Sequence, residues 1–274
     1  MQKIDAHQHF WKYNRTDYLW IDDQMEILQN DFLPEDLQPE QAKTGYTGSI
    51  AVQARQLTTE NDFLLDMAKE NDWIKGVVGW VDLQSQIVDE QLEKLSDIPK
   101  FCGVRHVIQD EADAEFMFRP AFLRGISLLT YYNLTYDLLI LQKQLVNTIQ
   151  FIDKFPNQKF VIDHLAKPLI KDGILEPWAS MINEISRREN VWCKLSGMVT
   201  EADWQTWSRD NFSRYLEVAY RAFGPDRLMI GSDWPVCQLA GDYTQVMNIV
   251  EDFIKPADVD KILGLNALKF YGID

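Results

Sequence analysis

The chain contains little cysteine and fewer basic than acidic residues. Its three cysteines, Cys102, Cys193 and Cys237, are far apart and form no Cys-x-x-Cys pair. This scatter argues against a disulfide framework or a cysteine-ligated zinc and favours reduced, buried thiols. Lysine and arginine number 27 against 42 acidic residues, which gives a formal net charge of −15. A chain this acidic is not expected to bind nucleic acid or an anionic membrane through its charge.

Long apolar runs are also absent. No uninterrupted apolar stretch is long enough to cross a bilayer. A histidine motif that begins at position 7 leaves no room for a signal peptide before it. We therefore expect a cytoplasmic protein whose partner is a small molecule, without a role for nucleic acid or membrane. The sequence leaves open whether the chain forms a homo-oligomer.

Short apolar segments alternate with helical patterns along the whole chain. Amphipathic stretches such as Thr59–Asn71, Asp203–Phe223 and Pro256–Tyr271 follow strand-like segments. The eight strand-like segments are Lys3–His9, Gly48–Ala54, Ile74–Asp82, Phe101–Ile108, Leu134–Ile140, Lys159–Leu165, Val191–Met198 and Arg227–Trp234. Such alternation requires parallel strands joined by crossover helices.

These repeats predict the α/β class and, within it, a (β/α)8 TIM barrel formed by a single domain over residues 1–274. Eight repeats close into a barrel more readily than they extend an open sheet. The alternative is a doubly wound sheet, whose first strand should lead into a glycine-rich turn. Here His-Gln-His-Phe-Trp stands at that point instead.

Histidine is scarce, yet it is concentrated where the predicted strands end. The chain has only four histidines, His7, His9, His106 and His164, and each lies near the carboxyl end of a predicted strand. Residues two apart on a strand project to the same side, so His7 and His9 should converge on one point. The active site of a TIM barrel lies at this end of the strands. The placement predicts a metal or substrate site there.

Charged residues mark the same end of other strands. Asp233 ends the eighth strand, although a turn former or helix cap is the alternative interpretation. His164 could instead be a buried structural histidine. Asp163 should project to the opposite side of the strand from His164 and is expected to hold a neighbouring loop. Arg105 and Lys194 interrupt apolar strands, so each needs an anionic partner, either a protein carboxylate or the substrate.

A long aromatic loop follows the first strand, at about residues 10–33. It contains Trp11 and further aromatic residues, and a loop of this length is uncommon unless it has a function. It could form a lid or a stacking wall for the substrate, or a hydrophobic cluster over the barrel rim. Trp80, at the end of the third strand, could line the pocket or fill a layer of the barrel.

Together these motifs resemble the amidohydrolase superfamily and, more narrowly, its amidohydrolase-2 lactonase group. The resemblance covers almost the whole chain. Besides His-x-His on strand one, His164 on strand six and Asp233 on strand eight, it is carried by the segments Ile4–Trp11, Asp31–Leu37, Gly79–Leu83, Gly103–His106, Leu134–Leu138, Val161–Pro168, Cys193–Gly197 and Gly231–Pro235. Strand four offers Arg105-His106 in place of a bridging lysine, and Asp137 replaces the histidine of strand five. A binuclear metal centre is therefore not expected.

The resemblance implies an enzyme that opens a lactone by attack of activated water. Asp233 would be the general base and then the acid, with His164, His7 and His9 as further catalytic residues. His7, His9 and Asp233 would hold one divalent ion, zinc before others. If no metal binds, the histidines and Arg105 would stabilise the oxyanion. The candidates for substrate binding are Arg105, Gln53, Trp80, Lys194 and Trp11.

The expected substrate is a sugar-derived lactone of the L-fucono or L-rhamnono type, opened to the aldonic acid. A dicarboxylate lactone would need several convergent arginines, and only Arg55 and Arg105 lie at predicted strand ends. No Gly-x-Ser-x-Gly elbow is present, which argues against an acyl-enzyme. The alternatives are a pyrone-dicarboxylate or muconolactone hydrolase, a decarboxylase of the same superfamily, and a barrel that only binds a ligand.

Overall fold

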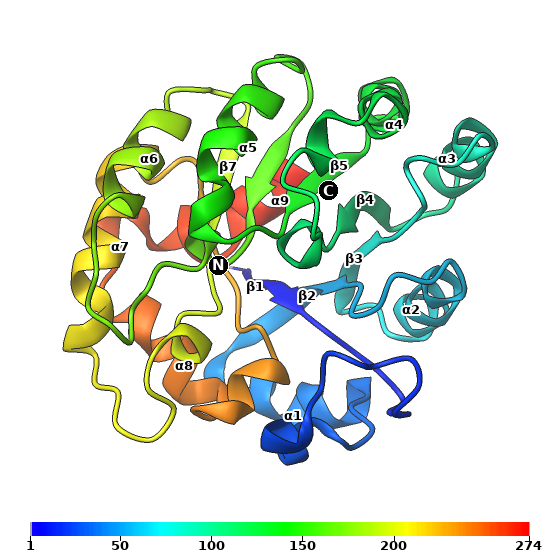
Figure 1. Ribbon diagram of the computed structural model, residues 1–274. Coiled ribbons are helices and arrows are strands. Elements are labelled where there is room, and N and C mark those ends of the chain that lie inside the picture. The colour runs from blue at the N-terminus through cyan, green and yellow to red at the C-terminus, as the bar shows by residue number, and fades with distance from the viewer. Residues whose placement is uncertain (1, 274) are drawn as a thin grey trace.

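The computed structural model describes residues 2–273, and its centre is a ring of eight parallel strands (Figure 1). Each strand pairs with the next one in the chain. The strands are β1 (Lys3–Gln8), β2 (Tyr46–Val52), β3 (Ile74–Gly79), β4 (Phe101–His106), β5 (Thr135–Leu138), β6 (Phe160–Ile162), β7 (Val191–Leu195) and β8 (Leu228–Ile230). The ring closes just beyond β8, where Asp233 N donates to His7 O at 2.8 Å and His9 N to Trp234 O at 2.7 Å. The predicted (β/α)8 barrel is confirmed.

Helices surround the ring on its outer side (Figure 1). They are α1 (Pro34–Thr44), α2 (Thr59–Glu70), α3 (Val88–Ser96), α4 (Pro120–Tyr131), α5 (Leu145–Ile152), α6 (Trp178–Ile185), α7 (Asp210–Phe223) and α8 (Tyr243–Glu251). In α2, Leu64 and Ala68 are spaced by four residues and are both buried, which places one apolar face against the sheet. No helix within residues 2–273 is long and apolar enough to cross a membrane.

A ninth helix, α9 (Asn266–Tyr271), lies behind the ring in the view of Figure 1 and closes its amino-terminal end. Ala267, Phe270 and Tyr271 pack there with inward-facing strand residues such as Ile4 and Met229. The predicted helix Pro256–Tyr271 is in fact interrupted, because a 3-10 turn at Pro256–Asp258 and a π-turn at Lys261–Leu265 precede α9. These changes of direction carry the chain from the outer layer to beneath the barrel.

Several strands end earlier than the sequence pattern suggests. The predicted strand through Leu165 stops at Ile162, and the one through Trp234 stops at Ile230. Beyond β6 the backbone is left-handed, with φ of 53° at His164, and beyond β8 Asp233 has φ of 58°. Left-handed residues cannot continue a strand. His164 and Asp233 therefore stand on tight turns just past the strand ends.

The loop between β1 and α1 folds into its own aromatic cluster. Trp11 and Phe32 exchange two backbone hydrogen bonds, of 2.9 and 2.8 Å, that draw the loop ends together. The buried ring of Trp11 packs against those of Tyr18 and Phe32, and Phe32 contacts Trp234. This loop thus covers the rim of the barrel beside the turn that follows β8.

Candidate active site

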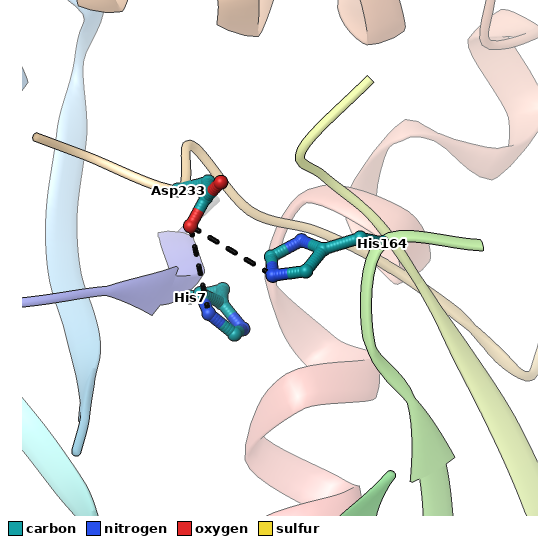
Figure 2. A group of neighbouring side chains, drawn as sticks. All are labelled: His7, His164 and Asp233. Carbon is teal, nitrogen blue, oxygen red and sulfur yellow. Dashed lines mark ion pairs between the residues drawn. The ribbon is translucent and has the colours of Figure 1, made fainter. Parts of the chain in front are cut away.

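Three histidines converge on one carboxylate oxygen at the carboxyl end of the barrel. Asp233 Oδ1 lies 3.4 Å from His9 Nε2 and 3.8 Å from both His7 Nε2 and His164 Nε2. Figure 2 shows His7 and His164 directed toward Asp233 from different segments of the chain. His7 Nε2 and His9 Nε2 are 3.1 Å apart, as expected for side chains two residues apart where β1 ends.

Neighbouring backbone holds these rings in place. His9 Nδ1 lies 2.7 Å from the carbonyl oxygen of Val52, to which it donates, so that its Nε2 carries the lone pair. His164 Nδ1 lies 2.9 Å from Ser196 Oγ on the turn after β7. The next residue, Gly197, has φ of 60°, and a Cβ placed there would approach the His164 ring to 2.5 Å. Only glycine leaves room for the ring at that position.

Burial determines the protonation states of the cluster. It lowers the pKa of His164 to about 4 and also lowers the pKa values of His9 and His7. Burial acts to raise the pKa of the Asp233 carboxyl, but His164 and then His9 and His7 outweigh it, and the net pKa lies below the ordinary value. Near neutral pH the site therefore contains an anionic carboxylate among neutral imidazoles.

This donor set fits a single divalent cation. The ligand atoms of His7, His164 and Asp233 lie within 4.8 Å of one another, and His9 borders the same space. Two ligands of a tetrahedral zinc ion are roughly 3.3–3.5 Å apart, close to the spacings above. Neutral imidazoles and a carboxylate are the forms that bind a metal. Arg105 Nη1 lies 3.3 Å from His7 Nε2, so a guanidinium group stands beside one of these donors.

A second charged layer lies immediately below, inside the barrel. Asp163 Oδ2 accepts from Arg105 Nη1 at 3.1 Å, and its Oδ1 lies 3.0 Å from Lys194 Nζ and 3.4 Å from His7 Nδ1. Lys194 also donates to Asp137 at 2.5 Å. The expectation that Asp163 holds a neighbouring loop is thus wrong. Because the strand ends at Ile162, strict alternation no longer applies, and Asp163 points into the barrel.

A cavity of about 440 Å³ opens above Asp233. Its floor includes His9, His164, Asp233 and Arg105. Its walls come from loops that follow several strands and consist of Asp17, Leu19, Trp20, Ala54, Arg55, Gln56, Val107, Gln109, Asp110, Leu139, Lys167 and Val236. This volume suits a monosaccharide-sized ligand.

Of the residues predicted to bind substrate, only Arg105 lines this cavity. Gln53 is fully buried and donates to Arg105 O at 3.2 Å, so it supports the strand that carries Arg105. Lys194 is enclosed by two carboxylates. Neither Gln53 nor Lys194 lines the cavity, and the contacts above lie within the protein, so their roles in substrate binding stay predictions.

The two predicted tryptophans lie elsewhere too. Trp11 is fully buried in the aromatic cluster of the loop and donates to Asn30 O at 2.9 Å. Trp80 points its indole nitrogen at His106 Nδ1, 3.3 Å away, and His106 in turn pairs with Glu111. Trp20, which lies further along the same loop as Trp11, contacts the cavity and donates to Ala54 O.

Most of the cavity wall could not be assigned from the sequence. Leu19 is 80% exposed, and Gln109 and Asp110 follow β4 without a distinctive motif. Lys167 offered a signal, since it follows His164 by three residues within the segment Val161–Pro168. Lys167 ends the left-handed turn after β6 and lines the cavity.

The chain is similar to known proteins along almost its whole length. A family model described as amidohydrolase matches residues 4–273. The L-fucono-1,5-lactonase of Burkholderia multivorans is 38% identical over 285 residues, which span 99% of this chain and 96% of that protein. The L-fucono-1,5-lactonase of Burkholderia ambifaria is 35% identical over 282 residues, with the same coverage of 99% and 96%.

The fold has a near-identical counterpart among solved structures. A crystal structure of an amidohydrolase from Burkholderia multivorans with bound HEPES superposes with a TM-score of 0.97, at 37% identity and with full coverage of both chains. A second crystal form of an amidohydrolase from that organism, with bound zinc, gives the same TM-score of 0.97.

Proposed function

Because the chain belongs to the amidohydrolase family, we propose that it is an enzyme that hydrolyses a sugar-derived lactone to the aldonic acid. The observation that carries the proposal is the convergence of three imidazoles on Asp233 at the floor of a cavity of about 440 Å³. The high identity to two L-fucono-1,5-lactonases supports this reaction and favours a 1,5-lactone of a six-carbon acid.

Asp233 is the general base. As an anion at the cavity floor, it accepts a proton from the attacking water while the water oxygen bonds to the lactone carbonyl carbon. The carbon–oxygen bond of the ring then breaks, and the protonated Asp233 returns its proton to the departing ring oxygen. His9 and His164, both within 3.8 Å of Asp233 Oδ1, orient the carboxylate and the water.

Arg105 stabilises the charge that develops on the carbonyl oxygen. Its guanidinium lines the cavity, while Asp163 and the carbonyl of Gln53 fix its position from below. A preorganised cation costs no reorganisation when the oxyanion forms. When bound, a divalent ion held by His7, His164 and Asp233, with His9 beside them, would supply Lewis-acid polarisation at the same place.

The walls fit a polyhydroxylated ring. Trp20, Leu139 and Val236 offer apolar contact for a ring face, and Gln56 and Gln109 offer amide groups for hydroxyls. Arg55 is already bound to Asp17 and Glu60. Few unpaired cations are therefore present for a dicarboxylate, which would demand several. These features favour a neutral sugar lactone over a pyrone-dicarboxylate or a muconolactone.

A proton-release assay on a lactone panel tests the proposal. The panel contains fresh L-fucono-1,5-lactone, other six-carbon aldonolactones, a pyrone-dicarboxylate and a muconolactone. We expect the highest kcat/KM on a six-carbon aldonolactone. Fast hydrolysis of the pyrone-dicarboxylate or muconolactone without activity on aldonolactones would contradict the substrate class. Carbon dioxide release would indicate a decarboxylase.

For the metal, we infer zinc, because three imidazoles and one carboxylate are nitrogen-rich donors of the kind zinc prefers. Elemental analysis of the purified protein, followed by chelation and reconstitution, tests this. The expected result is about one zinc per chain and an activity that falls on chelation and returns with zinc. Full activity in a metal-free preparation would leave Arg105 and the histidines as the carbonyl-stabilising groups.

A further inference from the structure

Lys167 lies on the cavity wall, and the mechanism above gives it no role. It ends a run of four residues with left-handed backbone, His164, Leu165, Ala166 and Lys167, at φ of 53°, 54°, 59° and 49°. A left-handed conformation costs a non-glycine residue roughly 1–2 kcal/mol, and it normally occurs singly. Strain of this kind persists only where the surrounding structure enforces it, and it concentrates at functional sites.

The strained turn brings His164 and Lys167 to the same cavity. Leu165 and Ala166 are fully buried, and Trp178 Nε1 donates to Leu165 O at 2.6 Å. Lys167 N donates to His164 O at 2.8 Å, which closes the turn. His164 and Lys167, at the first and last positions of the turn, both line the cavity. The turn therefore serves to present two side chains at once.

Lys167 differs from the other cations around the cavity in its contacts with carboxylates. Arg105 and Arg55 each donate a hydrogen bond to a carboxylate. Lys167 Nζ lies 3.6 Å from Glu201 Oε1, which is beyond hydrogen-bond length. Among the described residues that line the cavity, Lys167 is thus the cation with the least committed donors, and Glu201 keeps it at the wall.

We propose that Lys167 is a further catalytic residue, whose ammonium group binds the negative charge that forms on substrate oxygen as the lactone opens. This role rests on the proposed lactone hydrolysis. A lactone is neutral, whereas the tetrahedral intermediate and the carboxylate product are anions, so a cation here favours what forms during the reaction over what binds first. Lys167 donates hydrogen bonds and retains its protons, because Asp233 takes the proton from water and returns it to the ring oxygen. Glu201 is a positioning residue.

The test compares Lys167→Met and Lys167→Arg with Lys171→Met as a matched control. Lys171 lies on the same loop, its side chain is 65% exposed, and it pairs with Asp203 instead of facing the cavity. We expect Lys167→Met to lower kcat by about 10²-fold, the loss typical of one oxyanion-binding donor, with KM for the neutral lactone within about threefold. Binding of the aldonate product, measured by calorimetry, should weaken by about tenfold. Lys167→Arg should recover much of both losses, and Lys171→Met should match the parent protein.

Glu201→Gln provides an independent test should Lys167→Met fail to fold. It should lower kcat by a few fold and leave KM for the lactone unchanged. Near-native kcat and product affinity in a folded Lys167→Met protein would overturn the inference, as would a loss confined to KM. If that variant does not fold, native kcat in Glu201→Gln together with a large loss of kcat in a folded Lys167→Arg protein would overturn it. Absence of lactone turnover in the parent protein would instead contradict the proposed function.

Discussion

Two charged layers occupy the carboxyl half of the barrel, and they differ in access rather than in chemistry. The upper layer, formed by His9, His164 and Asp233, faces the cavity. The lower layer, formed by Asp137, Asp163 and Lys194, has no exposed surface. Both contain carboxylates and nitrogen bases at or near strand ends. Charged residues at this end of the barrel therefore either line the cavity or support the residues that line it, depending on how deep in the barrel they lie.

The lower layer supports the upper one through His7. Lys194 Nζ lies 3.1 Å from His7 Nδ1, and Asp163 Oδ1 lies 3.4 Å from the same nitrogen. From beneath, Tyr271 of α9 donates to Asp137 Oδ2 at 2.8 Å. A continuous chain of contacts thus connects the helix that closes the barrel with the ring that faces Asp233. Removing a lower-layer charge should therefore affect stability first and chemistry second.

The largest expected effect is on activity, at the upper layer. Asp233→Asn retains the shape of the side chain but loses the base, so kcat should fall by at least about 10²–10⁴-fold, with the thermal unfolding midpoint changed little. The control is Asp82→Asn, an exposed carboxylate after β3 that should leave kcat unchanged. Near-native turnover of lactone by Asp233→Asn would show that another group activates the water.

The next effect is on stability, at the lower layer. Lys194→Met leaves Asp137 and Asp163 buried with one cation fewer, and breaking a buried ion pair typically costs about 3–5 kcal/mol. Urea unfolding should show this loss. If unfolding changed by less than about 1 kcal/mol while KM rose strongly, Lys194 would belong to the substrate-binding layer, and the distinction between the layers would fail.

The stability of the protein should depend on pH through one group of the upper layer, His164. The pKa of His164 is lowered by burial from 6.5 to about 4, so between these values the unfolded chain binds a proton that the folded chain does not. The free energy of unfolding should therefore decrease as the pH falls through this window, by up to about 1.4 kcal/mol per pH unit from this group. In metal-free protein, His164→Gln should flatten the profile by that amount. An unchanged slope in urea titrations between pH 6 and 5 would contradict it.

The smallest expected effect is on KM, and it distinguishes Trp20 from Trp80. Trp20 contacts the cavity, whereas Trp80 is bound to His106 outside it. Trp20→Ala should raise KM for the lactone by about fivefold, equivalent to about 1 kcal/mol of lost ring contact. Trp80→Phe should change KM by less than about twofold. A reversed order in steady-state kinetics would mean that the ring binds toward β3 and β4.

Periodicity was a sound guide wherever the chain stays extended. His7 lies on β1 and His9 directly follows the strand, and their two-residue spacing correctly predicted that the rings converge. The same reasoning failed at Asp163 and His164, because β6 ends at Ile162 and the following turn is left-handed. A run of four left-handed residues without glycine has no recognisable sequence signature. The turn makes contacts with the surrounding structure, such as the hydrogen bond that Trp178 Nε1 donates to Leu165 O.

The sequence by itself determined the barrel, the family and the end of the barrel at which the histidines and Asp233 gather, because strand–helix alternation and two-residue periodicity are local properties of the chain. Only the tertiary structure decided which charges face the cavity. Lys194 meets Asp137 and Asp163, and Arg105 meets Asp163, across strands that are far apart in the chain. Such pairing depends on the depth of each side chain inside a closed ring, and depth is set only when all eight strands are in register.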